Sequence, residues 1–174
     1  MPKLISPTVG LHSAWLEAHA EWGPGSHEDG FGLSPNDEIE SPAGFREWVE
    51  HLADVSGGCT YRWIVERDQV LGGIALRHEF TDFVQWAGHI GCGIRPSARG
   101  RGIATWALGQ MLDEACLRGM TRVLAVCESG NSASAKTIER QGGVPERQGR
   151  SQAGSAWRYW IDLGERRNRP PGAQ

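Results

Sequence analysis

Arginine and glycine alternate in one short loop, a pattern that favours the binding of an anion. Arg99, Gly100, Arg101 and Gly102 stand directly before a run of apolar residues at helical spacing that begins at Ile103. Backbone N–H groups at the start of a helix have no partner within it, and the helix dipole adds positive potential there. Glycine lets a ligand approach the backbone closely. The loop therefore predicts a phosphate site, although a glycine-rich turn that only begins a helix has the same appearance.

Two well-known phosphate-binding loops do not fit these residues. A Walker loop needs Gly-Lys-Ser/Thr before its helix, whereas Ile103 and Ala104 follow Gly102 here. A dinucleotide-binding loop needs a third glycine or alanine where this chain has Thr105, and it opens a βαβ unit rather than following hairpins. The phosphate must therefore belong to another class of ligand.

The segment before the loop has the alternation of a strand that something approaches closely. Ile90, Cys92 and Ile94 would point to one side of this strand, and His89, Gly91 and Gly93 to the other. Two glycines weaken a strand, so they indicate either a ligand close to the backbone or a simple bulge.

The elements that position these residues follow from hydrophobic periodicity and turn residues. We expect strands at residues 3–6, 60–66, 70–77, 86–95, 122–127, 144–148 and 156–163, and helices from Thr8 to Ala20, from Ser41-Pro42 to Leu52, from Ile103 to Leu117 and from Asn131 or Ser132 to Gln141. The strands at 60–66, 70–77 and 86–95 read as an antiparallel meander.

The composition indicates one globular domain. The chain has 174 residues, of which 39% are hydrophobic, and we expect a single domain over residues 1–164 and a disordered tail over 165–174. No run reaches the roughly 20 apolar residues of a membrane span. The four cysteines are isolated and predict neither a metal site nor disulfides. We therefore expect a cytoplasmic protein without metal, membrane or nucleic-acid partners.

Charge is distributed unevenly along the chain. Residues 1–94 carry 14 acidic and 5 basic side chains, and residues 95–174 carry 7 acidic and 13 basic ones. Between Lys3 and Arg46 all charged side chains are acidic, namely Glu17, Glu21, Glu28, Asp29, Asp37, Glu38 and Glu40. The basic half favours an anionic ligand. The acidic segment is either a solvated surface or one wall of a site for a cationic amine.

Several motifs together resemble the GNAT superfamily of N-acetyltransferases. Residues 99–104 are similar to its acyl-CoA loop, whose pattern is Arg/Gln-x-x-Gly-x-Gly/Ala. The stretches HIGCGIRP, RVLAVCE and NSASAKTIERQGG arrive in the superfamily's order and spacing, and LGGIALRHEF and RYWIDL extend the likeness to a bacterial subgroup of predicted acetyltransferases. The resemblance covers residues 60–163 clearly and the first 59 in outline.

The resemblance implies a fold and a cosubstrate. The fold is α/β (α+β), with a mostly antiparallel sheet of about six or seven strands that splays between the fourth and fifth strands and is flanked by about four helices. The cosubstrate is acetyl-CoA. The implied coenzyme-binding residues are Cys92, Gly93 and Ile94 for the pantetheine, Arg99, Gly100, Arg101, Gly102, Ile103 and Ala104 for the pyrophosphate, and Asn131 and Ser134 for the CoA chain.

Acetyl transfer to an amine also needs a base and an acid. His89 is the first candidate for the base and Glu128 the second, with structural or surface roles as the alternatives. Many relatives carry a tyrosine that protonates the departing thiolate, seven residues after the motif asparagine. Counted from Asn131, this chain has Ile138 at that position. Ser134 and Tyr159 are the remaining candidates for the acid, unless solvent reprotonates the thiolate.

The sequence thus predicts an N-acetyltransferase that acts on a primary amine of a small cationic acceptor. Transfer to a protein N-terminus or lysine, and a non-catalytic CoA-binding module, stay open as alternatives. The acceptor and the oligomeric state, including a homodimer, are not specified by the residues.

Overall fold

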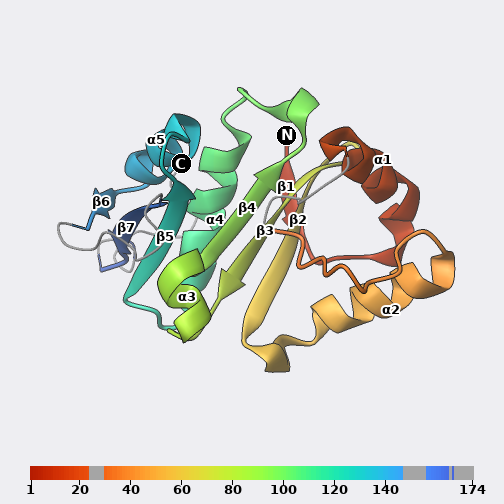
Figure 1. Cartoon of the computed structure of the whole chain (residues 1–174), viewed down its shortest axis with the longest axis horizontal. Helices are drawn as coiled ribbons and strands as arrows, with labels where there is room; N and C mark the ends of the chain where they lie inside the picture. Colours follow the sequence, from red (N-terminus) through yellow and green to blue (C-terminus); the bar gives the residue numbers. More distant parts are fainter. Residues whose placement is uncertain (24–29, 147–155, 165, 167–174) are drawn as a thin grey trace.

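The structure is a computed structural model that describes residues 1–23, 30–146, 156–164 and 166. Figure 1 shows two sheets side by side, with helices on both faces of the first and behind the junction of the two. The expected disordered tail, apart from Arg166, and residues 147 and 148 of the strand expected over 144–148 lie outside the described residues.

The first sheet is the predicted antiparallel meander with one added edge strand. Its order is β1 (Lys3–Ile5), β2 (Cys59–Glu66), β3 (Gln69–Arg77) and β4 (Ile90–Ile94). The turn between β2 and β3 is tight, because Arg67 and Asp68 both adopt left-handed backbone angles, with φ of 51° and 64°.

The second sheet contains the C-terminal strands. It has the order β5 (Arg122–Glu128), β7 (Ala156–Asp162) and β6 (Gly143–Pro145), and both pairings are antiparallel. An isolated bridge between Gly88 and Ala125 joins the two sheets at the start of β4. A Cβ atom at Gly88 would lie 2.9 Å from the carbonyl oxygen of Leu124, so glycine is needed for this close approach.

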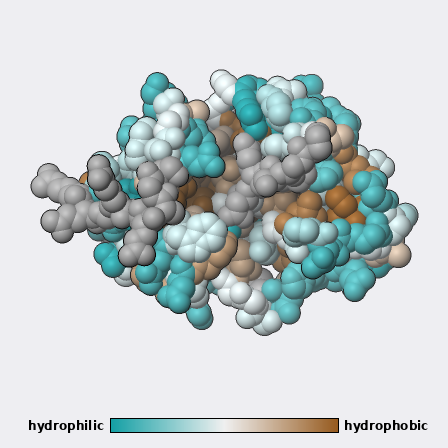
Figure 2. Space-filling model, in the orientation of Figure 1, coloured by the Kyte–Doolittle hydropathy of each residue, from teal (hydrophilic) through white to brown (hydrophobic). Residues whose placement is uncertain are grey.

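Helices cover the first sheet on both faces. The helices α1 (His12–Trp22) and α2 (Pro42–Ala53) pack with Trp63 and Val70 in one core, and α4 (Ile103–Leu117) packs on the other face with Ile64 and Ile74. The alternation of Trp63 and Ile64 along β2 supplies both cores. Figure 2 shows hydrophobic residues gathered beside α1 and α2, with hydrophilic residues around them.

The remaining elements are short. The helix α5 (Ser132–Arg140) packs against α4 and the second sheet. Short 3-10 turns occur at Val9–Leu11 (η1), Val55–Gly57 (η2) and Pro96–Ala98 (η3). The last of them connects β4 to the loop that precedes α4.

Two sequence predictions need correction. Residues 86 and 87, expected in a strand, belong to α3 (Asp82–Ala87), because the Thr81 hydroxyl accepts the N–H of Val84 and begins a helix there. Thr8 caps η1 rather than a long helix, since it accepts the N–H of Gly10, and α1 begins only at His12. In contrast, the predicted bounds of α4 agree with the structure at both ends.

Candidate active site

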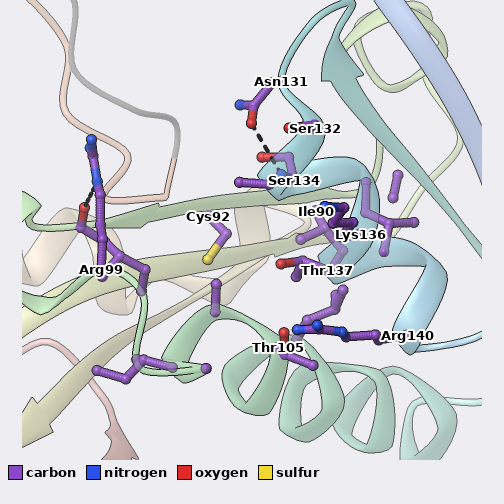
Figure 3. Close-up of a pocket in the computed structure, with 18 of the residues that line it drawn as sticks. Ile90, Cys92, Arg99, Thr105, Asn131, Ser132, Ser134, Lys136, Thr137 and Arg140 are labelled. Carbon is purple, nitrogen blue, oxygen red and sulfur yellow. Dashed lines mark hydrogen bonds between the residues drawn. The ribbon is translucent and has the colours of Figure 1, made fainter.

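A pocket of about 560 Å³ opens between the two sheets. Its walls are β4, the loop after η3, the first turns of α4, the middle of β5 and the first turns of α5 (Figure 3). Ile90, Cys92 and Ile94, which alternate along β4, line one side of it. The pocket therefore lies between β4 and β5, with α4 and α5 beside it.

The loop before α4 exposes unpaired backbone donors to this pocket. Gly100 and Gly102 have φ of 76° and 75°, a conformation that favours glycine. Gly102 caps α4 without a side-chain hydrogen bond. Within the described part of the chain, the N–H groups of residues 100–105 have no hydrogen-bond partner. These groups and the helix dipole make the loop suitable for a phosphate.

Most of the predicted coenzyme-binding residues line this pocket. The lining includes Cys92, Ile94, Arg99, Gly100, Gly102, Ile103, Ala104, Asn131 and Ser134. Gly93 and Arg101 are not among the lining residues. Gly93 pairs with Gly73 of β3. The Arg101 guanidinium forms an ion pair with Glu66 at 2.6 Å.

The first turns of α5 contribute polar groups. The Asn131 side chain accepts the N–H of Ser134 at 3.1 Å, so Asn131 caps the helix as predicted. The Ser134 hydroxyl has no hydrogen-bond partner among the described residues, and it lies beside Asn131 at the N-terminus of α5 (Figure 3). Ser134 is thus available to a ligand in the pocket.

Other pocket residues were not among the predicted coenzyme-binding residues. These are Ile90, Ala98, Thr105, Leu108, Ala125, Val126, Ser132, Ala133, Lys136, Thr137, Ile138 and Arg140. Helical spacing offers a signal for part of this set, because residues 133, 136, 137 and 140 lie near one another on a helix that begins at Ser132. Together with Arg99, Lys136 and Arg140 give the pocket a positive potential that suits an anionic ligand.

Arg99 is oriented by the end of β4. Its Nε donates a hydrogen bond to the Ile94 carbonyl at 2.9 Å. Arg99 is an exposed residue, and this hydrogen bond connects its side chain to the end of β4 beside the loop.

His89 has a different environment from a base exposed to substrate. Only 4% of the residue is accessible, and its Nδ1 accepts the backbone N–H of Leu124 at 2.9 Å. Its ring packs against Phe80 and Trp160. Burial lowers the pKa of His89, and the Arg77 and Arg122 guanidinium groups lower it further. His89 does not line the pocket.

The other two candidate catalytic residues also lie away from the pocket lining. Glu128 is exposed at the end of β5. Tyr159 is buried, and its hydroxyl donates to Glu139 at 3.3 Å. Burial, followed by the Glu139 carboxylate, raises the pKa of Tyr159. Of the four residues predicted for catalysis, only Ser134 is a pocket residue.

The acidic segment is largely engaged within the protein. Arg95, which is 5% accessible, donates from Nε to Glu21 and from Nη2 to Glu17, at 2.8 Å each. Mainly because of the Arg95 hydrogen bonds, the pKa of Glu21 is about 2. Glu38 accepts hydrogen bonds from the N–H groups of Glu40 and Ser41. The acidic residues Glu28 and Asp29 lie outside the described residues.

The described residues provide no group of histidine, cysteine or acidic side chains that could bind a metal ion. No helix among them is long and apolar enough to cross a membrane.

Comparison with known proteins identifies residues 17–144 as an acetyltransferase (GNAT) domain. A search of curated proteins gives no match. Because the matched residues make up most of the chain, the protein belongs to the GNAT acetyltransferase family.

Solved acetyltransferase structures have the same fold. RimJ of Mycobacterium smegmatis, in complex with CoA-disulfide, is 18% identical with a TM-score of 0.69, and the match covers 94% of this chain and 83% of that one. The protein yncA of Salmonella typhimurium, with its cofactor acetyl-CoA, is 19% identical with a TM-score of 0.62, and the match covers 99% of both chains. A spermidine N-acetyltransferase chimera of Vibrio cholerae SpeG and hSSAT is 14% identical with a TM-score of 0.63, over 97% of this chain and 99% of that one.

Proposed function

We propose that this protein transfers the acetyl group of acetyl-CoA to a primary amine. The observation that carries the proposal is the continuity of one pocket from the unpaired N–H groups at the start of α4 to the strand β4. A phosphate site and an apolar channel that adjoin each other match a ligand with a charged pyrophosphate and a long uncharged arm.

Each part of the pocket then has a role in binding. The loop from Arg99 to Ala104 binds the pyrophosphate through its backbone N–H groups. The side of β4 that carries Ile90, Cys92 and Ile94 lies along the pantetheine arm. Lys136 and Arg140 add positive charge for the remaining phosphate.

The bound thioester supplies an activated acetyl group, and the protein must orient it and manage protons. In the transfer, the amine nitrogen forms a bond to the acetyl carbon, the carbon–sulfur bond breaks, and the nitrogen loses a proton. We assign to Ser134 the donation of a proton to the departing sulfur, because its hydroxyl is unpaired among the described residues and faces the pocket. Ser134 then regains a proton from solvent. Because His89, Glu128 and Tyr159 do not line the pocket, we assign removal of the amine proton to solvent.

We propose a primary amine as the acceptor and do not assign a specific compound. The spermidine acetyltransferase chimera among the similar structures supports a small amine. The acidic segment supports a cationic acceptor less than its composition suggested, since Glu17, Glu21 and Glu38 have partners within the protein.

Release of free thiol from acetyl-CoA tests this function. The purified protein is incubated with acetyl-CoA and a panel of polyamines, amino sugars, amino acid derivatives and peptides with free N-termini. We expect amine-dependent thiol release and a matching acetylated product by mass spectrometry. CoA binding without release for any amine would instead favour a non-catalytic CoA-binding protein.

A further inference from the structure

We propose that His89 is a positioning residue that fixes the point at which β4 and β5 diverge. The inference rests on the proposed function, because that divergence forms the pocket assigned to acetyl-CoA. It gives His89 a role different from the general base expected from the sequence.

His89 binds one residue of β5 twice. Its backbone N–H donates to the Leu124 carbonyl at 2.7 Å, and its Nδ1 accepts the Leu124 N–H at 2.9 Å. The preceding residue, Gly88, forms the isolated bridge to Ala125. In the next residues β4 turns its side chains Ile90 and Cys92 to the pocket. Among the described residues, no backbone hydrogen bond joins β4 to β5 after His89.

The imidazole of His89 provides an acceptor for the Leu124 N–H at the point where β4 and β5 diverge. In a continuous sheet, the Leu124 N–H would bind a carbonyl of the neighbouring strand. Leu124 is fully buried, so its N–H has no access to water as a substitute. A buried donor without a partner is costly. The side chain of His89 replaces the missing carbonyl, and the strands can separate immediately afterwards.

This contact requires the neutral imidazole. Nδ1 can accept the Leu124 N–H only through its lone pair, so the ring proton is on Nε2. The ring lies against Phe80 and Trp160, with Arg77 of β3 and Arg122 of β5 as the nearby charges. Both charges are positive and oppose protonation of the ring. A group held neutral with its lone pair already engaged is poorly suited to take a proton from substrate.

Three variants separate positioning from catalysis. His89→Asn retains a side-chain oxygen that can accept the Leu124 N–H but cannot act as a base, whereas His89→Leu has no acceptor. His78→Leu is the control, because it also removes a histidine hydrogen bond, the partly buried one to the Thr60 hydroxyl, but His78 lies outside the pocket lining. Binding of CoA to each folded variant is measured by titration calorimetry, with melting temperature as the check on folding.

We expect CoA affinity to fall about tenfold or more in His89→Leu and to stay within about threefold of the parent in His89→Asn, since an unpaired buried amide costs enough to produce such a change. His78→Leu should bind like the parent. Equal affinity in all variants, or equal losses in Asn and Leu, would overturn the positioning role. If the parent protein itself fails to bind CoA, the proposed function is contradicted instead.

Two spectroscopic readouts test the contact directly. In ¹⁵N NMR spectra, the ring of His89 should show a protonated Nε2 and an unprotonated Nδ1 at neutral pH. The Leu124 amide should exchange slowly in the parent and in His89→Asn, and much faster in His89→Leu. A Leu124 amide that is equally protected in both variants would contradict the proposal, as would loss of thiol release in a His89→Asn protein that binds CoA normally.

Discussion

At the scale of single residues, Ser134 is the residue predicted for catalysis that lines the pocket. Replacement by alanine removes the only hydroxyl assigned to the departing sulfur. We predict that Ser134→Ala lowers kcat for thiol release by about 10²-fold, the lower end of general-acid effects, with little change in the KM for acetyl-CoA.

Ser132→Ala is the matched control for Ser134. Ser132 lines the same pocket in the same helical turn but is not assigned to the reaction. Its variant should retain the parent kcat. An increase in KM for Ser134→Ala without a fall in kcat would show that the hydroxyl only contacts the coenzyme.

His89 makes a second residue-scale prediction, about pH. Its pKa is lowered in the folded protein, so the unfolded chain binds more protons when pH falls below the ordinary value of 6.5. The stability that the neutral ring contributes is complete above that pH and decreases as pH falls toward the folded pKa. Urea unfolding between pH 7 and pH 5 should therefore show a steeper loss of stability in the parent than in His89→Asn. Identical slopes would contradict a buried neutral His89.

At the scale of elements, a charged cluster connects α1 to the end of β4. Glu21 accepts hydrogen bonds from Arg95 and from both the N–H and the hydroxyl of Ser97, which lies in η3 before the loop that precedes α4. Because Glu21 is partly exposed, its ion pair is screened, and we predict that Glu21→Gln lowers the free energy of unfolding by only about 1 kcal/mol. Chemical denaturation at pH 7 measures this change.

Glu17→Gln is the control for this cluster. Glu17 makes one hydrogen bond to Arg95, and its side chain is 62% exposed, so its replacement should cost less than that of Glu21. The contribution of Glu21 should also persist above its unfolded pKa of about 4.5 and be lost as pH falls toward 2. Equal effects of the two variants would show that the contacts between Glu21 and Ser97 are unimportant.

Elements with strong local signals could be predicted from the sequence, and those that depend on distant partners could not. The α4 helix has both an apolar stripe and a glycine before it, and its bounds were predicted correctly. The α3 helix was missed because Phe83 and Trp86 are exposed aromatic residues that resemble strand residues in sequence. What identifies α3 is the hydroxyl of Thr81, a weak local signal.

The same distinction applies to the site. The left-handed conformation of the loop before α4 depends on its own glycines, Gly100 and Gly102, so the sequence predicted an anion site there, and the family resemblance assigned its residues to the coenzyme. Whether His89 faces substrate or Leu124 depends on where β5 lies, 35 residues further along the chain. No local pattern contains that information. The internal partners of the acidic residues, such as Arg95, were hidden from the sequence for the same reason.

At the scale of the whole molecule, the uneven charge corresponds to the location of the pocket. The basic side chains that line it, Arg99, Lys136 and Arg140, all come from the C-terminal half of the chain. In the described part of the chain, Gly88 and His89 join the first sheet to β5, and the pocket lies between the two sheets. We therefore propose that a CoA molecule binds between the sheets with its pyrophosphate at the start of α4.

Titration calorimetry with CoA tests this claim most directly, using two glycine variants with equal backbone strain. Gly102 and Gly119 have φ of 75° and 85° and free space around the position of a Cβ, but only Gly102 lines the pocket. We predict saturable binding of CoA to the parent and to Gly119→Val, and a loss of affinity of about tenfold or more in Gly102→Val, whose side chain would occupy the phosphate site. No binding to the parent, or an unchanged affinity in Gly102→Val, would contradict the account.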